Sequence, residues 1–223
     1  MGTVSLKIDG KQITAHEGDN LLRVALDNGI YIPNLCALRD NPETAASCRL
    51  CFVEVSGRTQ PVTACTETIT EGMEVNTMGI GALRLARHGF ELLMASHTLD
   101  CAHCPKSGSC ELQRIAHHLG VKLKSKRLRE LRRSLPVDDS HPQIRYDPNK
   151  CVLCGRCVWL CREHLSIGTL GFAYRGFRRV VTTFEDEPLA RTRCGRCAEC
   201  VKVCPTGALL LKKKTRPEAG HRS

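Results

Sequence analysis

The chain has few aromatic residues and no long hydrophobic run. Aromatic side chains make up 4% of its 223 residues, which predicts small hydrophobic cores. No stretch approaches the roughly 18 apolar residues that a membrane helix needs. The first residues lead into an alternating strand pattern, without the apolar region of a secretion signal. These absences predict a cytoplasmic protein whose fold depends on more than apolar packing.

Nucleotide-binding signatures are also missing. No G-x-G-x-x-G motif follows a strand pattern, and no P-loop occurs. The glycine-rich stretch 168–172 lies between cysteine motifs and lacks the required strand and helix. We therefore expect no flavin or nicotinamide site in this chain, and no active site of its own.

Cysteine is what the chain has in abundance. A secreted disulfide framework normally has an even cysteine count in a much shorter chain. Where thiols stay reduced, cysteine motifs instead predict metal or redox chemistry. The fifteen cysteines fall into four sets with iron–sulfur spacing: Cys36, Cys48, Cys51 and Cys65; Cys101, Cys104 and Cys110; Cys151, Cys154, Cys157 and Cys161; and Cys194, Cys197, Cys200 and Cys204.

The two C-terminal sets share the spacing C-x2-C-x2-C-x3-C, which is typical of bacterial ferredoxins with two [4Fe–4S] clusters. In that motif three cysteines hold one cluster, and the fourth, expected at a helix start, binds the other cluster. The predicted ligand sets are Cys151, Cys154, Cys157 and Cys204 for one cluster, and Cys161, Cys194, Cys197 and Cys200 for the second. Zinc is disfavoured, because its structural sites usually pair two C-x2-C knuckles.

The N-terminal set predicts a [2Fe–2S] site. Two of its cysteines are separated by two residues, with one cysteine well before them and one well after. Plant-type ferredoxins use a related arrangement with a shorter first gap. A zinc site is the alternative.

The pattern of residues 1–78 predicts several strands and one helix. Alternating Val4, Leu6 and Ile8 predict a strand, and Asp9-Gly10 predicts a hairpin turn to a second strand. A helix capped by Asp19 or Asn20 is expected next. Its apolar positions are Leu21, Leu22, Ala25 and Leu26. With a further strand at 52–55, this pattern predicts a β-grasp ferredoxin domain.

The pattern changes to helical spacing at residue 79. Residues 79–96 and 111–119 are predicted helices within a domain spanning 79–120. His97 lies at the end of the first helix, four residues before Cys101, and is a candidate fourth ligand. Spacing alone leaves three competitors, His103, His117 and His118. A count of sixteen ligands for four sites favours His97, because fifteen cysteines leave one position unfilled.

A basic stretch and linker, residues 121–142, precede the C-terminal repeats at 143–223. Leu128, Leu131 and Leu135 lie at helical spacing, so this stretch is expected to form an amphipathic helix. It contributes to a formal charge of +10. We expect it to be a solvated or docking surface for an acidic partner.

Six segments resemble a known family. Those at 31–36 (YIPNLC), 48–51 (CRLC), 96–101 (SHTLDC) and 108–113 (GSCELQ) resemble the N-terminal region of the large iron–sulfur subunit of respiratory complex I. Those at 147–157 (DPNKCVLCGRC) and 204–209 (CPTGAL) are similar to parts of iron-only hydrogenases and NAD-linked formate dehydrogenases. The resemblance covers about residues 3–212 and points to the iron–sulfur (small diaphorase) subunit of multi-subunit NAD(P)-linked hydrogenases.

The resemblance implies one [2Fe–2S] cluster and three [4Fe–4S] clusters, one of them bound by His97, Cys101, Cys104 and Cys110. It implies an α+β protein with a β-grasp [2Fe–2S] domain, a small helical [4Fe–4S] domain and a bacterial-type 2[4Fe–4S] ferredoxin domain. Its expected partners are a flavin subunit that handles NAD(P)H and a hydrogenase catalytic subunit. Ala46 departs from the family, which usually has glycine there, and this puts the backbone approach to the [2Fe–2S] cluster in question.

Other functions remain open from the sequence. The same electron carriers would serve a formate dehydrogenase, an electron-bifurcating complex or a stand-alone polyferredoxin. A nucleic-acid-binding redox sensor would use the basic stretch, but few aromatic residues are available for base stacking. The expectation is an electron-transfer subunit without a membrane span and without a nucleic-acid partner.

Overall fold

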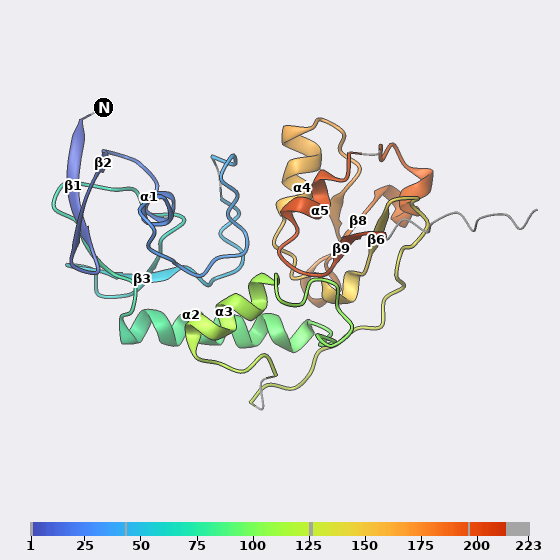
Figure 1. The fold of residues 1–223 in the computed structure, drawn as a ribbon, viewed down its shortest axis with the longest axis horizontal. Coiled ribbons are helices and arrows are strands. Elements are labelled where there is room, and N and C mark those ends of the chain that lie inside the picture. The colour runs from blue at the N-terminus through green and yellow to red at the C-terminus, as the bar shows by residue number, and fades with distance from the viewer. Residues whose placement is uncertain (1, 43, 125–126, 196, 213–223) are drawn as a thin grey trace, which may run out of the picture.

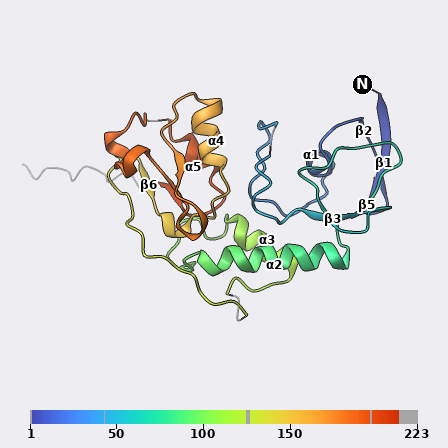
Figure 2. The same cartoon turned by 180° about the vertical axis from the view of Figure 1, so that it is seen from behind.

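The computed structural model describes residues 2–42, 44–124, 127–195 and 197–212. Two modules stand side by side above one long helix (Figure 1). We call residues 2–78 the N-terminal module, residues 79–120 the helical module and residues 143–212 the C-terminal module. Seen from behind, a loop of the N-terminal module lies between its sheet and the C-terminal module (Figure 2).

The N-terminal module is a five-stranded mixed sheet with one helix. Its elements are β1 (Thr3–Ile8), β2 (Lys11–His16), α1 (Leu21–Asp27), β3 (Phe52–Val55), β4 (Val62–Thr63) and β5 (Glu74–Asn76). The sheet order is β2-β1-β5-β3-β4, with β1 and β5 parallel and the other neighbours antiparallel. The predicted β-grasp fold is confirmed.

The first hairpin follows from its turn residues. Asp9 and Gly10 have φ angles of 51° and 79°, the left-handed conformation that a tight two-residue hairpin requires. The turn aligns Ile8 with Lys11 and so fixes the register of β1 and β2. Alternation then buries the side chains of Val4, Leu6 and Ile8 on one face of the sheet.

Helix α1 covers this buried face. The Asn20 side chain caps the helix by accepting the Arg23 backbone N–H at 3.2 Å. Leu21 and Leu22 are fully buried against the sheet, whereas Leu26, in the last turn, is exposed. The predicted helix and its cap at Asn20 are confirmed.

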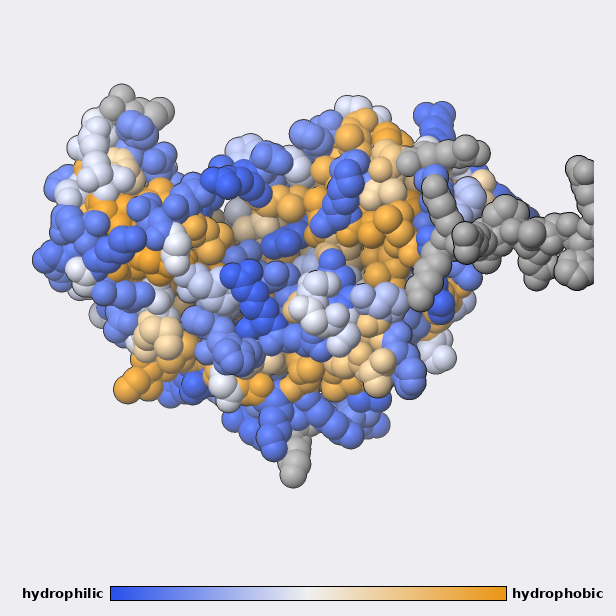
Figure 3. Space-filling model, viewed as in Figure 1, coloured by the Kyte–Doolittle hydropathy of each residue, from blue (hydrophilic) through white to orange (hydrophobic). Residues whose placement is uncertain are grey.

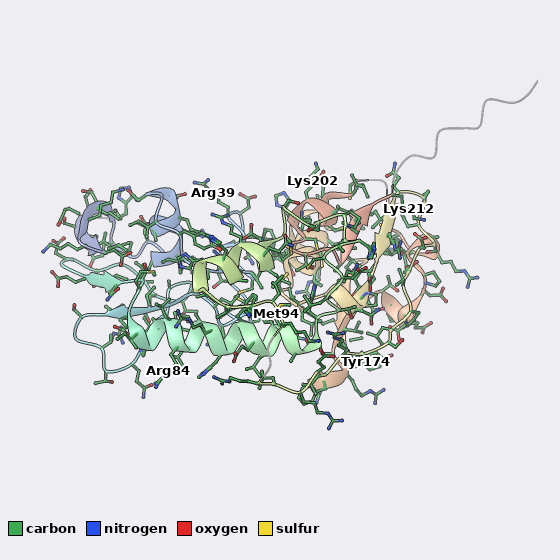
Figure 4. All side chains as sticks on the ribbon, turned by 60° about the horizontal axis from the view of Figure 1, so that its bottom comes forward. Arg39, Arg84, Met94, Tyr174, Lys202 and Lys212 are labelled. Atoms are coloured by element: carbon green, nitrogen blue, oxygen red, sulfur yellow. The ribbon has the colours of Figure 1, made fainter. Side chains whose placement is uncertain are left out.

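The helical module consists of α2 (Ile80–Ser96) and α3 (Glu111–Leu119), as the sequence predicted. Phe90 and Met94 of α2 are buried with residues of α3 in one hydrophobic cluster. Figure 4 shows Met94 in the half of α2 that lies toward the C-terminal module. Ile80, by contrast, is 88% exposed. It lies in the first turn of α2, where Figure 3 shows an apolar patch.

The N-terminal end of α2 is capped from another module. The Glu54 carboxylate of β3 accepts the backbone N–H groups of Gly81 and Ala82 at 2.8 and 3.3 Å. A carboxylate at this end also matches the positive end of the helix dipole. Glu54 therefore joins the sheet of the N-terminal module to the start of α2.

The basic stretch is not helical where it is described, so the expected amphipathic helix is wrong. Residues 127–135 have no regular secondary structure and pass beneath α2 before rising along the C-terminal module (Figure 1). The Leu131 N–H donates to the Ala95 carbonyl at 2.7 Å, and the Leu135 N–H donates to the Asn149 side chain at 2.9 Å. The backbone of this segment thus finds its hydrogen-bond partners elsewhere in the chain and not within a helix of its own. We call residues 121–124 and 127–142 the strap.

The C-terminal module contains short elements around its cysteines. They are β6 (Ile144–Tyr146), η1 (Pro148–Lys150), α4 (Arg156–Trp159), η2 (Leu160–His164), β7 (Gly171–Ala173), η3 (Gly176–Arg178), β8 (Val180–Thr182), η4 (Phe184–Asp186), η5 (Leu189–Arg191), α5 (Glu199–Val203) and β9 (Leu209–Leu211). Strands β6 and β9 pair antiparallel and join the two ends of the module, and β7 and β8 form a hairpin between the cysteine motifs. Within the described residues, no helix is long and apolar enough to cross a membrane.

Candidate metal centres

The four N-terminal cysteines form two pairs: Cys51 and Cys65 lie in the core of the N-terminal module, and Cys36 and Cys48 pack with residues of α2 and α3. All four are buried, with 5% or less of their surface exposed. The sulfurs of Cys36 and Cys48 are 3.5 Å apart, and Cys51 and Cys65 lie close enough for each to shift the pKa of the other. A [2Fe–2S] cluster takes two protein ligands on each iron, so two close pairs match what it requires.

Each pair contains one thiol that loses its proton readily. A hydrogen bond from Cys48 lowers the pKa of Cys36 to about 5, against the opposing effect of burial. A hydrogen bond from Cys51 lowers the pKa of Cys65 to about 7 in the same way. One thiolate in each pair is thus already favoured, and thiolates are the form that binds iron.

The loop that carries these cysteines has an unusual backbone. Ala46 and Arg49 adopt φ angles of 46° and 53°, which glycine tolerates and other residues rarely adopt. A glycine at position 46, which the family resemblance leads one to expect, would meet this demand without strain. Ala46 therefore does not prevent the loop from adopting the left-handed conformation, but it makes that conformation strained.

A glycine of α2 lets this loop approach the helix. A Cβ atom at Gly89 would lie only 2.5 Å from the Arg49 carbonyl oxygen. Only glycine therefore fits where the loop between Cys48 and Cys51 rests on α2. The sequence reasoning missed Gly89, because helical spacing alone gives no signal for a contact with a distant loop.

His97 follows directly after α2 and is buried, with 8% of its surface exposed. Its Nδ1 atom has no hydrogen-bond partner among the described residues. Burial lowers the pKa of the imidazole to about 4, although a hydrogen bond with the Lys150 backbone opposes the shift. The ring is thus neutral at neutral pH and keeps a free nitrogen lone pair, which is the state that binds metal.

The three competing histidines differ from His97 in their exposure and in their contacts. The His103 ring is largely exposed and bonded to Asp100, with Nδ1 2.7 Å from the carboxylate. His118 packs edge-on against Tyr31 with ring centroids 4.9 Å apart. His117 is exposed on α3. The Nε2 atom of His118 is also buried without a partner among the described residues, but His118 as a whole is only half-buried. His97 is therefore the most deeply buried of the four.

The cysteines of the helical module lie against the C-terminal module. A Cβ atom at Gly207 would lie 2.6 Å from the Cys104 sulfur. Next to it, the Glu111 N–H donates to the Pro205 carbonyl at 3.0 Å. Cys101 and Cys104 lie close enough to Cys110 to raise its pKa, after the larger effect of burial. This set therefore abuts the loop that follows Cys204.

Two cavities of the C-terminal module bring the remaining cysteines together. Each is lined by three cysteines of one motif and the fourth cysteine of the other motif. Cys151, Cys154, Cys157 and Cys204 line the first cubane cavity. Cys161, Cys194, Cys197 and Cys200 line the second cubane cavity. These are the groupings expected from cross-binding, and the assignment of ligands stays a prediction.

The local structure differs from the expected helix start. Cys161 lies in the π-helical turn η2 that follows α4, and Cys204 directly follows α5. The fourth cysteine of each motif thus comes at or after the end of a short helix, so the expectation was wrong on this point. The reason is that α4 and α5 begin two residues after the second cysteine of each motif and are only four and five residues long, so the fourth cysteine falls beyond each of them.

Burial disfavours free thiolates in the cubane cavities. It raises the pKa of Cys151 to about 12, of Cys154 to about 11 and of Cys200 to about 12. These thiols stay protonated at neutral pH unless a metal replaces the protons. Cys197 is the one exposed cysteine among those described.

The donor sets fit iron–sulfur groups better than a single ion. Within residues 2–42, 44–124, 127–195 and 197–212, no group of three or more His, Cys, Asp or Glu side chains has the arrangement for one metal ion. What the structure offers instead is two thiol pairs, two four-cysteine cavities, and a buried histidine four residues before Cys101 in the sequence.

Three family models match consecutive parts of the chain. Residues 2–79 match a 2Fe-2S iron-sulfur cluster binding domain. Residues 87–124 match the NADH-ubiquinone oxidoreductase-G iron-sulfur binding region, and residues 141–210 match the ferredoxin-like domain of NADH-quinone oxidoreductase subunit 3. The chain therefore contains 2Fe-2S and 4Fe-4S binding domains.

Curated relatives extend the match over nearly all of the chain. The NADP-reducing hydrogenase subunit HndD of Solidesulfovibrio fructosivorans is 38% identical over 94% of this chain and 36% of its own length. The alpha subunit of the NADPH-Fe(3+) oxidoreductase of Geobacter sulfurreducens is 36% identical over 94% of this chain and 24% of its own. An NADH-quinone oxidoreductase subunit of Streptomyces coelicolor is 35% identical over 92% of this chain and 24% of its own.

This chain is an iron–sulfur protein related to subunits of NAD(P)-linked hydrogenases and of complex I. The predicted resemblance is confirmed. The chain spans only about a quarter to a third of the length of these curated relatives. A chain in the crystal structure of an NAD+-reducing [NiFe]-hydrogenase matches more completely, with a TM-score of 0.84 and 29% identity over 99% of this chain and 90% of that chain.

Proposed function

We propose that this iron–sulfur protein is an electron-transfer subunit. It relays single electrons between a flavin subunit that handles NAD(P)H and the catalytic subunit of a hydrogenase. The proposal rests mainly on one observation: residues of all four candidate centres lie in a continuous series of contacts through the fold. We place the complex in the cytoplasm, where thiols remain reduced.

The proposed centres are one [2Fe–2S] and three [4Fe–4S] clusters. Their ligands are Cys36, Cys48, Cys51 and Cys65 for the [2Fe–2S] cluster; His97, Cys101, Cys104 and Cys110 for the histidine-bound cluster; and the four cysteines of each cubane cavity for the other two. When bound, such clusters accept and release one electron at a time. The role of the protein is to hold them close together and to set their potentials.

The contacts give the first cubane cavity a central position. Cys36 and Cys48 share a hydrophobic cluster with Cys154 of that cavity. Cys36 is also close enough to Cys154 to raise its pKa, though less than burial does. Asn34 strengthens this contact, because its side-chain oxygen accepts from Arg156 at 3.3 Å.

The other two centres meet the same cavity from different sides. The Cys104 sulfur lies against Gly207, in the loop that follows Cys204 of the first cubane cavity. The second cubane cavity shares a wall with the first at Leu209, which lines both. Electrons from the [2Fe–2S] and histidine-bound centres would therefore converge on the first cubane centre and continue to the second. Because Cys197 is exposed, the second centre is the natural point of exchange with a partner.

The basic strap supplies a candidate docking surface for a partner subunit. Arg133 donates to the carbonyls of Phe177 and Arg179, at 3.2 and 3.0 Å, and so joins the strap to the β7–β8 hairpin. The hairpin adds further arginines beside exposed Phe177 and Tyr174. Figure 4 views this side of the molecule, with Tyr174 at the end opposite Arg84. Exposed aromatic and arginine side chains are typical of interface hot spots, and the positive charge suits an acidic partner.

Electron transfer with the purified chain tests the proposal. The protein should pass electrons from a strong chemical reductant to an acceptor dye. It should neither reduce the dye with NADH nor consume hydrogen, because no flavin, nucleotide or hydrogen site is proposed in this chain. Dye reduction with NADH as sole donor would contradict the proposal, as would a protein that carries no redox-active iron.

A further inference from the structure

The glycine-rich stretch 168–172, which has no nucleotide-binding context, forms a wall of the second cubane cavity. The backbone N–H groups of Ile167 and Gly168 both donate to the Cys161 carbonyl, at 2.9 and 3.0 Å. Gly168 has a φ angle of 68°, which allows the chain to turn back over Cys161. The turn places the next residue, Thr169, in the lining of the cavity.

The hydroxyl of Thr169 is buried without a partner. The residue is 9% exposed, and its Oγ1 atom makes no hydrogen bond to any of the described residues. Nearly all buried polar groups in proteins have a partner, so an orphaned hydroxyl needs an explanation. Leaving it unpaired would be unfavourable.

Sulfur is the only side-chain acceptor that the cavity offers. Apart from its four cysteines, the described residues that line the cavity have aliphatic side chains, with Thr169 as the exception. An O–H group can donate to a cysteine thiolate or to a bridging sulfide of a bound cluster.

The first cubane cavity differs in this respect. Two hydroxyl-bearing residues line it, Tyr146 and Thr206. The Tyr146 hydroxyl donates to the Val181 carbonyl at 2.6 Å, and the Thr206 hydroxyl donates to the Lys150 carbonyl at 2.9 Å. Both hydroxyls thus have a backbone oxygen as partner, and each also lies near a cysteine sulfur: Thr206 Oγ1 is 3.8 Å from the Cys204 sulfur, and Tyr146 interacts with Cys151. The Thr169 hydroxyl has no partner of either kind among the described residues.

We propose that Thr169 donates a hydrogen bond to a sulfur of the cluster held by Cys161, Cys194, Cys197 and Cys200, and thereby raises its reduction potential. The inference rests on the proposed four-cluster assignment. Hydrogen bonds to the sulfurs stabilise the extra negative charge of the reduced state, and they are one of the ways a protein sets cluster potentials. A higher potential of this cluster favours electron flow from the first cubane centre to the second.

Redox titration of Thr169 variants, followed by electron paramagnetic resonance, tests this role. Thr169→Val keeps the shape of the side chain and removes the hydroxyl. It should shift one [4Fe–4S] cluster to lower potential and leave the other three centres unchanged. Thr169→Ser should restore the wild-type value. Thr206→Val is the matched control in the other cavity and should not shift the same cluster.

The outcomes separate this inference from the proposed function. A wild-type chain lacking four clusters contradicts the proposed function itself. If wild type and Thr169→Val both hold four clusters and give identical redox titrations, the role of Thr169 is overturned while the proposed function stands. If Thr169→Val and Thr169→Ala lose one cluster while Thr169→Ser keeps all four by iron content, the hydroxyl holds the cluster and the contact is supported. Loss of that cluster in Thr169→Ser as well would overturn it.

Discussion

The N-terminal and C-terminal modules bury their cysteines in different surroundings. In the N-terminal core, two of fifteen buried residues are cysteines, and a five-stranded sheet supports the rest. In the C-terminal core, four of twelve are cysteines, and its sheets have two strands each. The first module has an apolar core of its own, whereas the second is organised around its sulfur ligands. A bound metal group should therefore matter for function in the first module and for folding in the second.

Removing iron should have the largest effect and sharpen this contrast. After anaerobic chelation, backbone amides of residues 144–146 and 209–211 should lose protection from hydrogen exchange, because β6 and β9 close around the cubane cavities. Amides of β1 and β2 should stay protected. Equal loss of protection in both modules would contradict the comparison.

Replacing His97 should remove one centre without disturbing the others. His97→Ala should lose about four iron atoms and keep the [2Fe–2S] signal, because only the helical module loses a ligand. His97→Cys should keep the cluster but lower its potential, since a thiolate adds a negative charge. Iron analysis and redox titration measure both effects. His103→Ala is the matched control, and a cluster lost there instead would identify His103 as the ligand.

Gly89→Ala should break the contact between α2 and the N-terminal cysteine loop. The added methyl group would meet the Arg49 carbonyl oxygen, so we expect a loss of about 1–3 kcal/mol in the free energy of unfolding. The [2Fe–2S] spectrum should change as the loop moves, while the [4Fe–4S] signals remain. Gly171→Ala, where a Cβ meets no atom within 4 Å, is the control. Equal effects of the two substitutions would show that the contact at Gly89 is unimportant.

Reversing the charge of the strap should weaken partner association with little effect on iron content. Glutamate at Arg129, Arg132 and Arg133 should reduce affinity for an acidic partner subunit about tenfold, which is about 1.4 kcal/mol. Co-purification and binding at two salt concentrations measure the effect. An unchanged affinity would remove the strap from the interface.

Ala46→Gly should have the smallest effect, and it should be favourable. The left-handed backbone at Ala46 costs roughly 1–2 kcal/mol for a residue with a Cβ atom, and glycine removes that cost. Part of the gain is lost to the greater freedom of glycine in the unfolded chain. Thermal unfolding of the N-terminal module measures the balance, and a clear destabilisation would contradict the argument.

Regular elements and cysteine groupings could be predicted from sequence because they depend on local patterns. The turn at Asp9-Gly10, the cap at Asn20 and the bounds of α3 follow from neighbouring residues. The conformation of the strap could not be predicted, because its leucine spacing is helical while its hydrogen bonds go to α2 and Asn149. Gly89 and Thr169 carry no local signal, since each is defined by a contact with a distant part of the chain.

The iron content of the anaerobically purified chain tests the central claim most directly. One [2Fe–2S] and three [4Fe–4S] clusters predict about 14 iron atoms per chain, with little zinc. Four distinct clusters should be seen on stepwise reduction. Stoichiometric zinc, or iron well below that value in protein protected from oxygen, would contradict the account of four iron–sulfur centres in one chain.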